Sequence, residues 1–400
     1  MGGAEISLLD LLRSMRTAEP DWELSLVLGE DGPLADRARE LGVQTIIEHF
    51  PRGLARLGDA GNNLIQTLWH SLKASAGIVS YARSLRRRLS NIEPHIIHTN
   101  GFKMHLLGLW TRPGNTPVVW HIRDYVSSRT LMKRMLGLSG SRCAAVIANS
   151  QSVARDVQNV CGPGIETHCV YNAVDLTEYS PEGEKADLDR MSGLPPVEPG
   201  VVRIGLIATL ARWKGHEVFL RALAGLPANL PYRAYIVGGA IYQTDNSQHA
   251  IEDLRVLAAD LNLGNQVGFT GFVARPALAM RALDIIVHAS TQPEPFGRVI
   301  AEGMACRRAL ICSAAGGAVE LITDGHDALT HQPGDHECLS ERIAELASNP
   351  ELRARLGRAG RATAERRFKL SRLASELIPI YERVVAQTTV TTGTQLAASR

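Results

Sequence analysis

Short apolar segments alternate with helical patterns along most of the chain. Each apolar segment is rich in β-branched residues and is bounded by turn residues, which predicts strands. They lie at 23–29, 43–49, 95–100, 117–124, 144–150, 167–174, 202–210, 232–239, 266–272, 284–290, 309–315 and 327–332. Strands separated by helices of this length form parallel sheets with helices on both faces. We therefore predict an α/β protein with two Rossmann-like domains that face each other across a cleft.

The composition of the sequence changes between the two halves. Residues 181–200 are polar and proline-rich and have no sustained period, which predicts a linker. We expect an N-terminal domain over 1–180 and a C-terminal domain over 201–370. The helical pattern at 371–388 is expected to return to the N-terminal domain, and 389–400 to be a disordered tail.

The first residues, "GGAEISLLDLLRSM", combine a glycine turn with an amphipathic helix. This is how the first βα unit of such a domain continues after its strand, but no strand precedes Gly2. The first strand of these sheets lies centrally, so we expect a gap in the sheet, or another segment in its place. We also expect the native start to lie upstream of Met1.

Bulk composition excludes several classes of protein. With 45% hydrophobic residues and a formal net charge of +2, the chain gives no argument for binding nucleic acid. No apolar run approaches the ~18–20 residues of a membrane-spanning helix. The six cysteines lack CxxC or metal-site spacing, which favours reduced, structural thiols in a cytoplasmic protein.

One segment, 52–88, is strongly basic and holds the single acid Asp59. It also carries apolar residues at helical spacing, so it could lie as an amphipathic helix on an anionic membrane. The alternative is a helix packed on the sheet with a solvated basic face. Its cations are Arg52, Arg56, Lys73, Arg83, Arg86, Arg87 and Arg88.

Candidate ligand-binding residues follow the predicted strands, because open α/β sheets bind ligands beyond the carboxyl ends of their strands. Arg212 and Lys214 follow the strand at 202–210, and paired cations suit a diphosphate. Gly316 and Gly317 follow the strand at 309–315 in a turn whose amides could face a phosphate. Solvated cations and a plain glycine turn are the alternatives.

The segment "PEPFGRVIAEGMA" follows the strand at 284–290. Pro295 suits a first helical position, which would leave the amides of Phe296 and Gly297 free to face acceptor-rich groups. Eight residues of helix rise about 12 Å. Glu294 and Glu302 would then hold opposite ends of one long, hydroxyl-rich ligand.

Two further features concern the first half and the linker. His121 ends the strand at 117–124, where it is either a polar contact to a ligand or a structural histidine. The Asp-x-Asp pair Asp187 and Asp189 falls in the predicted linker rather than at a strand end. We assign it to solvent and expect no metal site.

Together, the motifs "GGAE", "ANS", "NAVD", "ARWKGH", "EPFGRVIAEGMA" and "AGGAVELI" resemble those of retaining glycosyltransferases of the GT-B fold, family 4 (group 1). The resemblance spans nearly the whole chain. The glutamate–seven–glutamate block from Glu294 to Glu302 is its most specific part. The sequence departs from the family pattern at "NAVD", where glycine more usually stands second.

The resemblance implies a role for each candidate residue. Arg212 and Lys214 would hold the donor diphosphate and stabilise it as leaving group. Glu294 would bind hydroxyls of the donor sugar with help from the Phe296 and Gly297 amides, and Glu302 would bind the ribose. The remaining implied contacts are Gly3 to the phosphates, His121 to the sugar, and Gly271, Phe272 and Val273 to the base.

The implied activity is transfer of a hexose-type sugar from a UDP- or GDP-linked donor to a saccharide or lipid-linked acceptor, in polysaccharide biosynthesis. The configuration would be retained by front-face transfer, with no metal or other cofactor. The protein would be cytoplasmic or peripheral on the inner face of the membrane. A nucleotide-sugar 2-epimerase and a non-catalytic nucleotide-sugar-binding homologue are the alternatives. No GxGxxG follows a strand, which argues against a nicotinamide enzyme.

Overall fold

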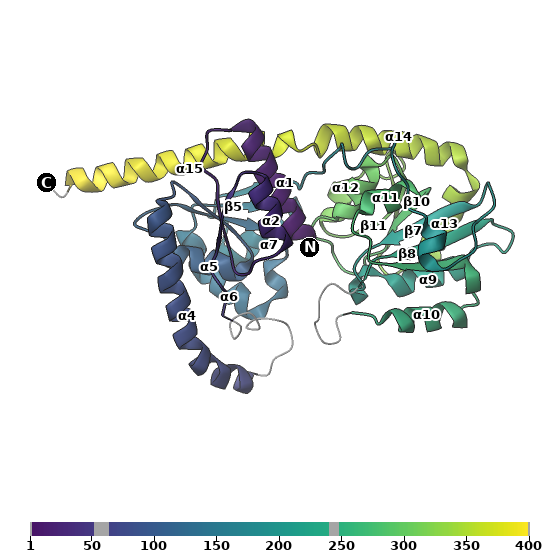
Figure 1. Cartoon of the computed structure of the whole chain (residues 1–400), viewed down its shortest axis with the longest axis horizontal. Helices are drawn as coiled ribbons and strands as arrows, with labels where there is room; N and C mark the ends of the chain where they lie inside the picture. Colours follow the sequence, from purple (N-terminus) through teal and green to yellow (C-terminus); the bar gives the residue numbers. More distant parts are fainter. Residues whose placement is uncertain (1, 52–63, 240–247, 399–400) are drawn as a thin grey trace. The chain divides into compact units, whose positions relative to one another are not determined.

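The computed structural model describes residues 2–51, 64–239 and 248–398 of the chain. It divides into two compact units, coloured by sequence in Figure 1. The first unit comprises Met1–Asn172 and Leu370–Arg400, and the second comprises Ala173–Lys369. The segment 181–200 therefore belongs to the second unit, and the chain returns to the first unit for its last helix.

The described part of the first unit contains two parallel sheets. The larger has the order β3-β4-β5-β6, and β1 pairs with β2 separately. The described strands of this unit therefore do not join into one sheet. The strands are β1 (Ser25–Leu28), β2 (Gln44–Ile47), β3 (Ile97–Asn100), β4 (Val118–Ile122), β5 (Ala145–Ala148) and β6 (Thr167–Cys169).

Helices pack on these strands through buried apolar side chains. The core of the larger sheet is centred on Trp120 and Leu136, both fully buried. Ser150 caps α7 by accepting a hydrogen bond from the Val153 amide at 3.1 Å, as expected for serine before a helix. The helices are α1 (Gly3–Ala18), α2 (Pro33–Glu40), α4 (Leu64–Ile92), α5 (Phe102–Thr111), α6 (Thr130–Ser139) and α7 (Gln151–Cys161).

The last helix, α15 (Ser371–Ala398), packs against α1 within the first unit. The Ser14 hydroxyl donates to the Leu370 carbonyl at 2.7 Å and accepts from the Ala374 amide at 3.0 Å. The prediction of a disordered tail from residue 389 is wrong for the described part, because α15 continues to Ala398.

The second unit is built on one parallel sheet with the order β12-β11-β10-β7-β8-β9. This is the doubly wound arrangement that the alternating pattern predicts. The carboxyl ends of the two central strands, β7 and β10, are adjacent because these strands pair directly. The strands are β7 (Val202–Ile207), β8 (Tyr232–Val237), β9 (Val267–Gly271), β10 (Ile285–His288), β11 (Ala309–Ser313) and β12 (Leu329–His331).

Helices cover both faces of this sheet (Figure 1). One face buries an apolar core that includes Phe219, Leu339 and Ile343. Helices α12 and α14 also pack against β11. The helices are α8 (Leu188–Ser192), α9 (His216–Ala224), α10 (Ile251–Asp260), α11 (Pro276–Arg281), α12 (Arg298–Ala305), α13 (His336–Ser348) and α14 (Pro350–Arg367).

The predicted linker is wrong, because part of 181–200 is packed into the second unit. Helix α8 lies against β9 and its Leu188 is fully buried. Asp189 is also buried, which corrects its assignment to solvent. Its carboxylate accepts hydrogen bonds from Tyr235 at 2.6 Å, Arg203 at 2.6 Å and Arg233 at 3.3 Å.

Candidate functional site

Lys214 and Glu294 meet beyond the carboxyl ends of β7 and β10. The Lys214 ammonium donates to both carboxylate oxygens of Glu294, at 3.0 and 2.8 Å. The Ser290 hydroxyl donates to the same carboxylate at 2.9 Å, and His288 Nε2 lies 3.2 Å from it. The site therefore begins with a carboxylate that is held from three directions.

The backbone fixes the loop that carries Lys214. Gly215 has φ +76°, and a Cβ there would stand 1.9 Å from the Ala289 carbonyl oxygen. The position therefore requires glycine both for its left-handed backbone and for the close approach of the neighbouring loop. The Thr291 amide donates to the Trp213 carbonyl at 2.8 Å, which joins the two loops directly.

The neighbours of Glu294 determine its ionisation state. Burial alone would raise the pKa of Glu294, but Lys214 and then His288 outweigh it and hold that pKa well below its ordinary value. Glu294 is consequently ionised, and its negative charge holds Lys214 in place. The Lys214 ammonium also lies 3.9 Å from the centre of the Trp213 ring, a cation–π contact.

Arg212 lies on the same short 3-10 turn as Lys214, over Arg212–Lys214, and its side chain is exposed. The structure thus brings the two predicted cations into one loop, adjacent to Glu294. Neither the sequence nor its spacing predicted that the lysine and the glutamate would be direct partners. The pairing follows from the β7–β10 adjacency.

Helix α12 begins later than predicted. Gly297, at φ +90°, is the residue before the helix, and Arg298 is the first helical residue. Pro295 is therefore not at a first helical position, and Glu294 and Glu302 are not separated by eight residues of helix. The amide of Phe296 precedes the helix, while its side chain is buried against Phe368.

Glu302 has a partner of its own, one turn back along α12. Arg298 Nε donates to Glu302 at 3.0 Å, and both side chains are largely buried. Arg298 also donates to the Ala173 carbonyl at 3.3 Å. The structure thus places the two predicted glutamates in separate ion pairs.

The Gly316–Gly317 turn lies against Glu294. The Gly317 amide donates to the Glu294 carbonyl at 2.6 Å, and residues 294 and 316 form a short parallel bridge. A 3-10 helix follows over Gly317–Glu320. Three loops, after β7, β10 and β11, therefore converge on one place.

The residues expected to contact a base lie after β9. Gly271 has φ +73°, and its carbonyl accepts from the Gly238 amide at 3.0 Å. Phe272 is 59% exposed, which is unusual for a phenylalanine, and Val273 is partly buried. These residues are separated from Lys214 by strand β8.

Two candidates belong to the first unit. Gly3 is the first residue of α1 and is exposed, and the Glu5 carboxylate accepts the Gly2 amide. His121 is 2% exposed near the end of β4. It contacts His98 and Arg123, which the sequence analysis did not single out.

Two residues of the site, His288 and Ser290, were not predicted from the sequence although they contact the predicted Glu294. His288 and Ser290 both point to Glu294, and their i, i+2 spacing at the end of β10 is the signal that could have identified them. Within the described ranges, no three metal-ligating side chains gather into a candidate metal site. Over the same residues, none of the helices is both long and apolar enough to cross a bilayer.

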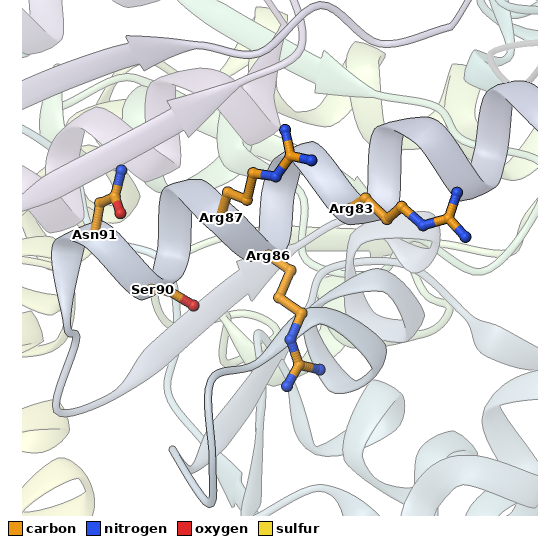
Figure 2. Close-up of a pocket in the computed structure, with 5 residues that line it drawn as sticks. All are labelled: Arg83, Arg86, Arg87, Ser90 and Asn91. Atoms are coloured by element: carbon orange, nitrogen blue, oxygen red, sulfur yellow. The ribbon is translucent and has the colours of Figure 1, made fainter.

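A basic pocket lies on α4 of the first unit (Figure 2). For the described side chains of this helix, Tyr81, Leu85 and Leu89 are buried in the core. Their apolar face is therefore unavailable to a bilayer, and from residue 77 onward the helix packs on the core with its basic face exposed. Side chains 52–76 lie outside the described residues. The pocket is lined by Arg83, Arg86, Arg87, Ser90 and Asn91.

Comparison with known families assigns both units. The model of the group 1 glycosyl transferases matches residues 199–363, and the model of glycosyltransferase family 4 matches residues 1–178. Together they cover most of the chain. The protein belongs to the group 1, family 4 glycosyltransferases, and its two Rossmann-like units are those of the GT-B fold.

Individual relatives agree with the family. Spore coat protein SA of Bacillus subtilis is 31% identical over 227 residues, which cover 54% of this chain and 59% of that protein. The D-inositol 3-phosphate glycosyltransferase of Jonesia denitrificans is 27% identical over 260 residues, covering 62% of this chain and 59% of that protein. The chain thus spans about three fifths of the length of these curated relatives.

Solved structures share the fold over nearly the whole chain. Anabaena HepE, crystallised with UDP and glucose, matches with a TM-score of 0.77 at 24% identity, covering 95% of this chain and 96% of HepE. At this level of identity the likeness concerns the fold.

Proposed function

We propose that the protein is a glycosyltransferase that uses a nucleotide-sugar donor. The observation that carries this proposal is the convergence of Lys214, Glu294 and the Gly316–Gly317 turn at the ends of β7, β10 and β11. Cations in a loop at strand ends, with a glycine turn beside them, suit a diphosphate. Family membership supports the same reaction class.

In the proposed reaction, the bond between the anomeric carbon and the diphosphate oxygen breaks, and a bond to the acceptor oxygen forms on the same face. The acceptor proton passes to the departing phosphate oxygen. Negative charge thus grows on the diphosphate, where Arg212 and Lys214 would stabilise it. Glu294 keeps Lys214 oriented before the donor binds, and its carboxylate can also accept hydroxyls of the donor sugar.

Several predictions from the sequence extend this proposal. Retention of configuration, independence from metals, a hexose as the sugar and a saccharide or lipid-linked acceptor all belong to it. So do the ribose contact of Glu302, the base contact of residues 271–273, and a cytoplasmic location. For Glu302, the Arg298 pair implies that ribose hydroxyls would share the carboxylate with a guanidinium.

The first prediction concerns Lys214→Ala. Loss of one preorganised charge partner of the leaving group should lower the transfer rate about 100–1000-fold. The assay would measure sugar transfer from UDP-, GDP- and ADP-linked hexoses to saccharide and lipid-diphosphate acceptors, with the product anomer assigned by NMR. Lys185→Ala, an exposed lysine of the same unit, is the matched control and should keep its rate.

Equal rates in the two lysine variants, with both proteins folded, would refute the site. Conversion of the nucleotide sugar without any acceptor would show the epimerase alternative instead. Donor binding without turnover across all acceptors would favour the non-catalytic homologue.

For α4 we propose a peripheral contact with an anionic membrane surface. Support comes from charge complementarity: Arg83, Arg86 and Arg87 are exposed and line one pocket, whose other lining residues, Ser90 and Asn91, are uncharged (Figure 2). Each basic residue near an anionic bilayer contributes about 1 kcal/mol. The contact would be electrostatic, since the apolar face of this part of the helix is buried.

The second prediction follows from this charge. Replacing Arg83, Arg86 and Arg87 with glutamate should reduce cosedimentation with phosphatidylglycerol vesicles at least ~100-fold. Replacing three exposed arginines elsewhere, Arg134, Arg142 and Arg358, with glutamate changes the net charge equally and should retain more binding. Equal loss in both variants, or equal binding to phosphatidylcholine vesicles, would contradict a specific surface.

A further inference from the structure

Three hydrogen-bond donors converge on one oxygen atom of Glu294. Oε2 lies 2.8 Å from the Lys214 ammonium, 2.9 Å from the Ser290 hydroxyl and 3.2 Å from His288 Nε2. The other carboxylate oxygen, Oε1, accepts from the same ammonium at 3.0 Å. Glu294, His288 and Ser290 are all buried, with exposed fractions of 8%, 4% and 1%. All four residues belong to the second unit.

The ionised carboxylate determines where the protons of its neighbours lie. It only accepts hydrogen bonds, so the Ser290 hydroxyl donates its one proton to Oε2. His288 Nε2 is 3.2 Å from that carboxylate and 3.0 Å from the Ser290 oxygen, and both are acceptors towards it. Nε2 must therefore carry a proton. The other ring nitrogen, Nδ1, has no hydrogen-bond partner among the described residues, so the buried ring makes its polar contacts through Nε2.

Neighbouring strands fix the backbone that carries Ser290 and His288. The hydroxyl of Ser313, on β11, donates to the Ser290 carbonyl at 2.6 Å. His331 Nε2, on β12, lies 3.2 Å from the His288 carbonyl. Both donors to Glu294 are thus held at the backbone by residues of the two adjacent strands.

Lys214 cannot bind a diphosphate fully while it binds Glu294 with two N–H groups. An ammonium has three N–H donors, and two of them are directed at the carboxylate. To donate more than one hydrogen bond to phosphate oxygens, Lys214 has to release part of this contact. A carboxylate has about four lone-pair sites on its two oxygens. Without the ammonium, Oε2 would keep two donors, Ser290 and His288, for its two sites.

The remaining donors matter because Glu294 is buried. Burial raises the pKa of its carboxyl group, and Lys214 and then His288 lower it. When Lys214 releases an N–H, the hydrogen bonds from Ser290 and His288 continue to favour the ionised form, since both bind the charged carboxylate. A protonated Glu294 would no longer attract the ammonium, and Lys214 would lose its orientation.

We propose that Ser290 and His288 are positioning residues that keep the Glu294 carboxylate charged and in place while Lys214 turns to the diphosphate of the donor. The part played by the diphosphate rests on the proposed function, whereas the hold of Ser290 and His288 on the carboxylate does not. Neither residue touches the substrate in this account, and every group in it belongs to the second unit.

The hold on the carboxylate is tested by carbon NMR of the full-length protein with glutamate labelled at the carboxyl carbon. Glu294 is assigned by the signal that is lost in Glu294→Gln. In Lys214→Met combined with Ser290→Ala, the titration midpoint of Glu294 should be at least ~1 pH unit higher than in Lys214→Met alone, a 10-fold change in proton affinity. Equal midpoints in the single and the double variant would overturn the proposal.

The functional arm compares two variants that remove equivalent hydrogen bonds. Ser290→Ala removes a buried hydroxyl that donates to Glu294 at 2.9 Å, and Thr363→Val removes one that donates to Asp327 at 2.9 Å in the same unit. We expect Ser290→Ala to lower kcat about 10-fold at pH 7 and Thr363→Val to stay within about threefold of the wild type. Loss of a donor raises the pKa of Glu294, so the deficit of Ser290→Ala should grow as the pH falls.

Position 288 gives a second pair in case Ser290→Ala does not fold. His288→Gln keeps an N–H that can donate to Glu294, whereas His288→Leu removes it, so only the leucine variant should show the 10-fold loss of kcat.

Two kinetic results would overturn the proposal: a kcat of Ser290→Ala that matches Thr363→Val at every pH, or equal losses in the two variants at position 288. A wild type that transfers no sugar would instead refute the proposed function. The NMR midpoints would still decide whether Ser290 and His288 hold the carboxylate.

Discussion

At the scale of single residues, the site depends on side-chain contacts that could not be predicted from the sequence. Lys214 and Glu294 are 80 residues apart, yet both carboxylate oxygens accept from one ammonium. The sequence predicted each residue as a ligand contact. The structure adds that each binds the other, so the cation is oriented by the protein itself.

The third prediction is for Gly215→Ala. Its φ of +76° and the 1.9 Å approach of a Cβ to the Ala289 carbonyl leave no room for a side chain. The variant should lose about 1–3 kcal/mol or more of stability and displace Lys214. Thermal unfolding and the transfer assay together would measure this.

Gly164→Ala is the matched control for that prediction. No atom lies within 4 Å of its Cβ position, and its φ is not positive, so it should be nearly neutral. A Gly215→Ala protein with the melting temperature and rate of the control would show that the close approach of the two loops is unimportant.

At the scale of elements, periodicity located all twelve strands of the described structure but misjudged what lies between them. Segment 181–200 has the prolines and polar residues of a linker, yet Leu188 is buried and α8 packs on β9. A five-residue helix is too short to give a periodic signal. Similarly, Pro295 looks like a helix start, but Gly297 adopts the left-handed conformation that delays α12 to Arg298.

The fourth prediction tests α8 through its two aspartates. Asp189→Ala would leave Arg203 and Arg233 without their shared buried carboxylate, and should cost about 3–5 kcal/mol. Asp187→Ala removes the capping bond to the Arg190 amide and should cost about 1 kcal/mol. Urea unfolding of both variants would measure the difference. An equal loss of unfolding free energy in the two variants would mean that the buried carboxylate of Asp189 stabilises the protein no more than the cap of α8 does.

At the scale of the whole molecule, the family and fold were predictable because each strand end carries its own short motif. The contacts between those motifs were not predictable from the sequence, because the order of strands in the sheet decides which loops lie next to each other. The hydrogen-bonded residues Tyr381, His98 and His121 illustrate how distant positions become partners. They are up to 283 residues apart in the sequence and become neighbours because α15 returns to the first unit.

The most direct test of the central claim is calorimetric titration of the full-length protein with UDP, GDP, ADP and inorganic diphosphate. We predict that one nucleoside diphosphate binds, that diphosphate alone competes with it, and that Lys214→Ala weakens binding of that nucleotide about 100-fold while Lys185→Ala does not. Undiminished binding to Lys214→Ala, or no binding of any of these ligands to the wild type, would contradict a diphosphate site at this loop.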